Sequence, residues 1–76
     1  MELAQLVCER SNELCGTYGP DDVGDAALNL VRTVGSDKAV FQHASAIFQT
    51  RLDADPADAA SRDGLRLLTR AMAFLR

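Results

Sequence analysis

Hydrophobic residues recur at helical spacing in four stretches of this chain, and helix-breaking residues separate the stretches. The breaks are Gly16, Gly19-Pro20, Gly35-Ser36 and Asp55-Pro56. No stretch alternates apolar and polar residues with the β-branched enrichment that is typical of strands. The pattern predicts an all-α fold, a compact bundle of three to four short helices arranged as antiparallel pairs. We expect the helices at about residues 2–15, 21–34, 37–53 and 56–75, in a single helical domain spanning residues 1–76.

The first three stretches each place their larger apolar residues on one face of a helix, which predicts the buried side of each element. The third has the clearest amphipathic pattern, with Lys38, Gln42, Ser45 and Gln49 on its opposite face. The predicted buried faces consist of Leu3, Val7 and Leu14 in the first helix, Val23, Ala27, Leu30, Val31 and Val34 in the second, and Val40, Phe41, Ala44, Ile47, Phe48 and Leu52 in the third.

The fourth stretch differs because its apolar arc covers about 180° of the helical wheel. An arc this wide indicates a helix that lies between two neighbours or uses part of its surface on a partner. Gly64 lies within the arc and lowers helix propensity by about 1 kcal/mol relative to alanine, which suggests a packing reason for it. Ala57, Ala60 and Ala71 extend Gly64 into a seam of small residues for close helix packing.

Residues at the segment boundaries predict where the helices begin and end. Gly16 and Gly35 suit the carboxy-terminal ends of the first two helices. Ser36 is expected to cap the amino-terminal end of the third helix. Asp55 is expected to cap the fourth, because Pro56 directly after it suits a first helical position.

Composition narrows the class of protein. Apolar residues make up 47% of the 76, and the aromatic side chains are limited to Tyr18, Phe41, Phe48 and Phe74, so the core must be mainly aliphatic. The formal net charge of −3 argues against a general nucleic-acid binder, which needs a basic face. There is no apolar run long enough for a transmembrane helix and no signal-peptide pattern, so we expect a cytoplasmic protein without membrane attachment. High alanine, aspartate and arginine content is typical of a GC-rich bacterial genome.

The two cysteines and the single histidine do not form a recognisable site. Cys8 and Cys15 are separated by about 10.5 Å along one helix, beyond the roughly 7 Å limit for a disulfide, so both are expected to be unpaired within the chain. With one histidine they complete no zinc-binding pattern. His43 lies at the edge of an apolar face and is expected to be a half-buried packing residue.

Two short resemblances suggest alternative functions. "VGSDKAV" places Ser36 mid-chain before a helix, and "LLTRAMAFL" is similar to a last helix, as in acyl and peptidyl carrier proteins. The resemblance implies a degenerate carrier domain, since Asp37 stands where carriers have a leucine after the attachment serine. "ALNLVRTVGSDKAVFQHASAIF" resembles a helix-turn-helix and implies a small DNA-associated regulator, although its second helix exposes a single lysine.

Charge along the fourth helix provides the leading candidate for function. Arg62, Arg66 and Arg70 form a stripe at helical spacing, either a solvated face or a surface for an acidic partner. The first two segments are net acidic and the last is net basic, which favours self-association. On the wide apolar arc, we expect Leu67 and Phe74 to face a partner and Leu65 and Met72 to face the core.

No catalytic constellation is present in the sequence, and no phosphate-binding loop or calcium loop. We therefore predict a non-catalytic protein–protein interaction or regulatory module that forms a homo-oligomer, with no cofactor and no metal.

Overall fold

The computed structural model describes residues 2–75 and confirms the all-α prediction. Four α-helices are present: α1 at Leu3–Thr17, α2 at Val23–Val34, α3 at Lys38–Ala54 and α4 at Ala59–Met72. A 3₁₀ turn, η1 at Pro20–Asp22, leads into α2. Within the described residues, no helix has both the length and the hydropathy that a membrane crossing requires.

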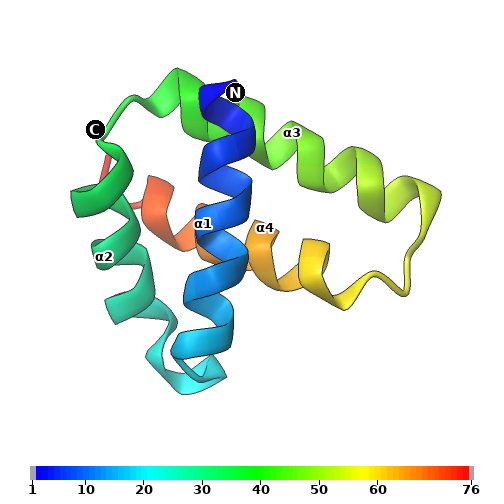
Figure 1. Cartoon of the computed structure of the whole chain (residues 1–76), viewed down its shortest axis with the longest axis horizontal. Helices are drawn as coiled ribbons and strands as arrows, with labels where there is room; N and C mark the ends of the chain where they lie inside the picture. The colour runs from blue at the N-terminus through cyan, green and yellow to red at the C-terminus, as the bar shows by residue number, and fades with distance from the viewer. Residues whose placement is uncertain (1, 76) are drawn as a thin grey trace.

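The helices pack into a bundle with extents of 30 × 26 × 22 Å (Figure 1). Helices α3 and α4 form an antiparallel pair joined by a short connection, as the pattern predicts. Helix α1 crosses in front of this pair and contacts α2 as well. Helix α2 packs against the later part of α4, so α4 contacts each of the other three helices.

The core forms where the predicted apolar faces meet. Phe41 and Phe48 from α3 are its largest side chains and are almost fully buried. All of the predicted inward positions on α2 and α3 are buried or partly buried. Leu3 is an exception, since 47% of its surface is exposed at the first turn of α1, beyond the reach of the central packing. The buried hydrophobic residues are Ala4, Val7, Cys8, Leu14, Ala26, Ala27, Leu30, Phe41, Ala44, Phe48, Leu67, Leu68, Ala71 and Leu75.

Gly64 is the position on α4 where a side chain of α3 packs against the helix backbone. The ring of Phe48 lies directly over it: a Cβ built on Gly64 would be 2.7 Å from Cε2 and 2.9 Å from Cε1, and would also overlap Cζ. No real Cβ tolerates such distances, so only glycine lets the ring seat against the helix backbone. The predicted packing reason for Gly64 is therefore confirmed. The proposed seam is shorter than expected, because Ala57 and Ala60 are exposed.

The two predicted helix caps are wrong. Asp37 caps α3, with its Oδ1 accepting a hydrogen bond from the Ala39 N–H at 3.0 Å, and Ser36 lies outside the helix. Asp58 caps α4, with its Oδ1 accepting from the Ser61 N–H at 3.1 Å. In both cases a carboxylate closer to the first helical residue satisfies the free backbone donors.

Asp55 and Pro56 start a turn instead of the fourth helix. The Asp58 N–H donates to the Asp55 carbonyl at 3.0 Å, and the Asp55 side chain accepts from the Ala57 N–H at 3.1 Å. Aspartate followed by proline is also the signature of a β-turn, and the turn is the structure that forms. Helix α4 consequently begins three residues later than predicted, at Ala59.

The two predicted glycine stops have different outcomes. Gly35 ends α2 as predicted, with a φ of 94° that favours glycine and with its N–H donating to Val31 at 3.0 Å. Gly16 does not end α1, which continues to Thr17 and closes with a 2.8 Å bond from the Tyr18 N–H to Leu14. The Tyr18 hydroxyl accepts a hydrogen bond from Asn29 of α2 at 3.2 Å, which fixes this end of α1 against its neighbour.

Candidate interaction surface

Helix α4 has an inner face in the core and an outer face in solvent. The inner face carries Ser61, Gly64, Leu67, Leu68 and Ala71, all buried. The prediction that Leu67 faces a partner is wrong, because it is 0% exposed. The inner face includes the contact between Gly64 and Phe48, and Leu67 lies three residues further along the same face.

The outer face of α4 borders an open groove of about 610 Å³. We refer to it as the arginine groove. Its apolar wall includes one side chain from the start of α2 and one from the end of α3, so the groove forms only when three helices come together. The arginine groove is lined by Val23, Leu52, Arg62, Leu65, Arg66, Thr69, Arg70 and Ala73.

All three predicted arginines lie on this groove and are exposed. Arg70 has the most defined position: its guanidinium stacks over the Phe74 ring at 5.7 Å. It also lies beside the α2 backbone, 3.6 Å from where a Cβ on Gly24 would be. Stacking on an aromatic face favours arginine over lysine. The guanidinium of Arg70 thus lies between the Phe74 ring and the start of α2.

Arg62 has only a weak ionic contact. Its Nε lies 3.8 Å from Oδ1 of the neighbouring Asp63, and both side chains are well exposed. Asp58 stands four residues before Arg62 but does not pair with it, because the Asp58 carboxylate accepts hydrogen bonds from Ser61. Within residues 2–75, Arg66 and Arg70 make no ion pair. The groove therefore presents guanidinium groups that have little intramolecular neutralisation.

The other positions on the wide arc of α4 are distributed between core and surface differently from the prediction. Phe74 is 45% exposed, in agreement with a surface role, and lies next to Arg70. Leu65 and Met72, expected in the core, are only partly buried, and Leu65 lines the groove. Part of the signal for Leu65 was present in the sequence: it stands three residues after Arg62, and residues at that spacing are neighbours on a helix surface.

A small cavity of about 70 Å³ lies beside the groove, between α1, α2 and α4. Cys15, Tyr18, Asp63 and Arg66 supply its polar lining. Burial raises the pKa of the Cys15 thiol, and the nearby Asp63 carboxylate raises it further. A thiol with a raised pKa is a poor nucleophile, so this arrangement does not activate Cys15. The cavity is also smaller than the roughly 300 Å³ of an ordinary ligand pocket.

The remaining titratable candidates occupy separate places. Cys8 is buried in α1, where burial raises its pKa, and its thiol lies 3.5 Å from the Ala44 carbonyl. Both cysteines are free, as predicted. His43 is exposed, not half-buried as expected, and its Nδ1 lies 3.3 Å from Glu2. Among residues 2–75, no three histidine, cysteine or acidic side chains come together as a metal site.

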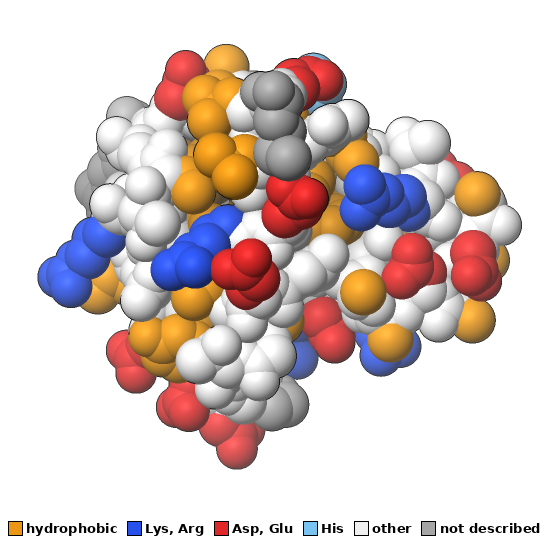
Figure 2. All heavy atoms as spheres, viewed as in Figure 1, with side chains coloured by type: hydrophobic (Ala, Val, Ile, Leu, Met, Phe, Trp, Pro, Cys, Tyr) orange, Lys and Arg blue, Asp and Glu red, His pale blue; other side chains and the backbone are white. Residues whose placement is uncertain are grey.

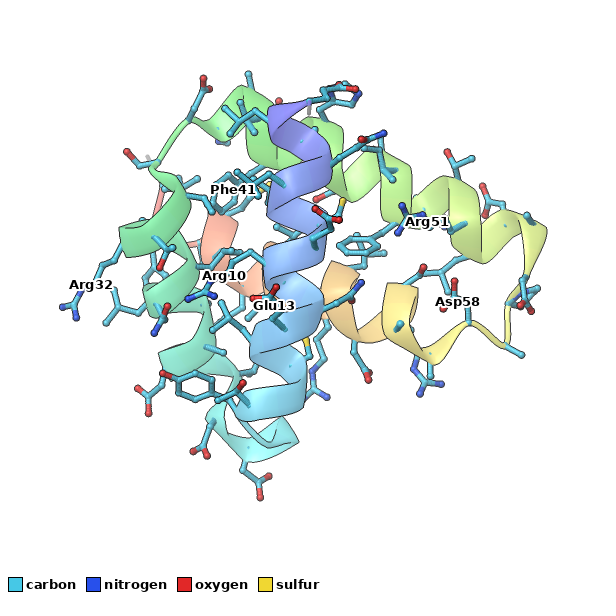
Figure 3. The ribbon with its side chains drawn as sticks, in the orientation of Figure 1. Arg10, Glu13, Arg32, Phe41, Arg51 and Asp58 are labelled. Carbon is cyan, nitrogen blue, oxygen red and sulfur yellow. The ribbon has the colours of Figure 1, made fainter. Side chains whose placement is uncertain are left out.

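A second exposed apolar area lies where α1 begins (Figure 2). Leu3 and Leu6 are 47% and 45% exposed and border an open groove with Val34 of α2. The nearby charges are largely neutralised, since Arg10 and Glu13 form a 3.0 Å ion pair along α1 (Figure 3). This area lacks the free cations that distinguish the arginine groove.

Comparison with known proteins gave no match: no family model fits the chain, and neither a curated protein nor a solved structure is significantly similar to it.

Proposed function

We propose that this protein is a non-catalytic protein–protein interaction module, of a bacterial regulatory type, whose partner docks in the arginine groove. One observation carries the proposal: an open apolar groove is bordered by three exposed arginines from a single helix. Arginine is enriched in protein interfaces and at their energetic centres, where its planar head group pairs with carboxylates.

Two parts of the groove have different physical roles. The side chains of Leu65, Leu52 and Val23 offer apolar surface whose removal from water favours association. The guanidinium groups give direction, because they attract acidic groups and repel basic ones during encounter. A partner that fits has apolar side chains for the groove and carboxylates for its arginine border.

The first partner to test is a second copy of the chain, since a domain of 76 residues gains stability from association. Sedimentation equilibrium up to high micromolar concentration is expected to show self-association. Leu65→Glu places a charge in the groove and should dissociate the assembly while circular dichroism still reports a folded helical protein. The matched control is Leu6→Glu, which puts the same charge on the exposed area at α1 and should leave association unchanged.

A wild type that remains monomeric at these concentrations would exclude self-association. Equal effects of Leu65→Glu and Leu6→Glu would show that the groove has no special role.

The carrier alternative is supported by one feature, the exposure of Ser36 between α2 and α3. Co-expression with a phosphopantetheinyl transferase followed by intact mass tests it, because attachment to Ser36 would add the mass of the prosthetic group. The DNA-binding alternative requires the helix-turn-helix of α2 and α3 to bind a polyanion, and a gel shift measured across salt concentrations tests that.

A further inference from the structure

We infer that the occupant of the arginine groove is the acidic turn of a second copy, in a reciprocal two-fold dimer. The acidic turn consists of Asp21 and Asp22 of η1 and Asp25 in the first turn of α2. The inference rests on the proposed function, which it deepens by naming the partner and the segment that binds.

The acidic turn carries charge that a single copy leaves unneutralised. Asp21, Asp22 and Asp25 are all exposed. None of them forms an ion pair within the part of the chain that the structure describes. No side-chain hydrogen bond caps the start of α2, so the carboxylates of Asp21 and Asp22 are not used as helix caps. Three carboxylates within five residues repel one another, and an incoming cationic surface would relieve that repulsion.

The arginine groove carries the opposite charge, and the two surfaces adjoin. Val23 directly follows Asp22 in the chain and lines the groove. One residue further, Gly24 lies against the guanidinium of Arg70. Acidic turn and groove are thus neighbours on one side of the molecule, while no ion pair joins them within a copy. Each surface remains available for the complementary surface of another copy.

Neighbouring complementary surfaces are the arrangement that a two-fold dimer needs. When the turn of one copy enters the groove of the other, the symmetry axis produces the second, identical contact at once. Both copies then gain neutralised carboxylates and arginines, and the apolar side chains of Val23 and Leu65 lie near the centre of the interface. No open-ended chain of molecules forms, because the two contacts close on each other.

We expect a weak interface, because a molecule this small can contribute only a limited area of surface to it. A standard interface covers about 800 Å² on each partner, whereas one whole copy exposes 4596 Å². Since charge contributes strongly here, the dissociation constant should rise with salt concentration.

A charge exchange tests the inference by sedimentation equilibrium on the full chain. Asp22→Arg and Arg66→Glu should each weaken self-association about tenfold or more, because each places like charges in contact. The double variant Asp22→Arg/Arg66→Glu has the net charge of the wild type and restores opposite charges across the interface. Its dissociation constant should return to within about threefold of the wild-type value. Glu9→Arg, on the outer side of α1, is the matched control for Asp22→Arg and should have little effect.

The outcomes separate this inference from the proposed function. If the double variant associates as poorly as Arg66→Glu alone, the acidic turn is not the occupant and the inference is wrong. Dissociation by Leu65→Glu would still support the groove as the docking site in that case. If the wild type does not self-associate at all, the inference is overturned, and self-association through the groove is overturned with it.

Discussion

The inner and outer faces of α4 differ in how closely other atoms approach the helix backbone. On the inner face, Gly64 lets the Phe48 ring lie directly on the backbone, and Leu67 is completely buried beside it. On the outer face, long arginine side chains border an open groove and leave its floor in contact with solvent. Both faces contain leucine, so leucine alone does not distinguish core from surface.

Gly64 and the arginines distinguish the two faces better than leucine or alanine, because Ala71 is buried while Ala73 lines the groove. Glycine and alanine on the inner face permit close packing, which removes neighbouring leucines from water. Arginine beside Leu65 on the outer face needs hydration for its head group and keeps the helix from packing there. The orientation of α4 therefore follows from its smallest and its most charged residues.

The largest expected effect comes from truncating a leucine on each face. Leu67→Ala should destabilise the protein by about 2–5 kcal/mol, because it opens a cavity in a fully packed core. Leu65→Ala should cost less than half as much, because its side chain is only partly buried. Urea denaturation at low protein concentration measures both free energies of unfolding. Equal losses would contradict the assignment of inner and outer faces.

A smaller effect is expected from adding one methyl group to the inner face. Gly64→Ala should destabilise the protein by about 1–3 kcal/mol despite the better helix propensity of alanine, because the new Cβ overlaps the Phe48 ring. Gly16→Ala is the matched control. Gly16 is an exposed residue of α1, and no atom lies within 4 Å of where a Cβ on it would be. That substitution should stabilise by about 0.5–1 kcal/mol.

A double variant, measured by the same urea denaturation, tests whether the Phe48 ring causes this loss of stability. Phe48→Leu removes the ring that overlaps the new methyl group, so Gly64→Ala should cost less in that background than in the wild type. A Gly64→Ala protein as stable as Gly16→Ala would show that the ring does not need the glycine.

The sequence was sufficient to predict the helices and the inward faces of α2 and α3. Their apolar residues recur on narrow arcs, and such an arc leaves one possible orientation toward the core. The wide arc of α4 is compatible with several orientations toward the core. Which edge turns inward depends on Phe48 meeting Gly64, a contact between two helices that periodicity within one helix does not encode.

The candidate surface could be predicted in part for the same reason. The arginine stripe lies within one helix, so spacing alone identified Arg62, Arg66 and Arg70. The groove also needs Val23 from α2 and Leu52 from α3, whose positions depend on tertiary packing. The start of α4 was misplaced because aspartate followed by proline fits two local structures, a helix start and a turn. The hydrogen bonds of Asp58 to Ser61 favour the later start.

The smallest expected effect concerns that start, where the acid side chain of Asp58 meets the inner face of α4 (Figure 3). The buried Ser61 donates its hydroxyl to Oδ2 at 2.7 Å and its N–H to Oδ1 at 3.1 Å. Hydrogen bonding from the Ser61 side chain, and then from its backbone, lowers the pKa of Asp58. A carboxyl whose pKa is lower in the folded state stabilises the fold above its unfolded pKa, and loses that contribution as pH falls through the folded value.

Thermal unfolding midpoints measured by circular dichroism from neutral pH downward test this linkage. Asp58→Asn keeps a good capping side chain but does not titrate, so its midpoint should fall less steeply than that of the wild type below about pH 4. Because the other carboxylates titrate in both proteins, the difference between the two curves reports Asp58 alone. Ser61→Ala removes the hydroxyl that contributes most to the lowered pKa, and it should flatten the same part of the wild-type curve. Parallel curves for the wild type and Asp58→Asn would show that the carboxylate charge at this cap does not contribute to stability, and that the cap acts through its hydrogen-bond acceptor only.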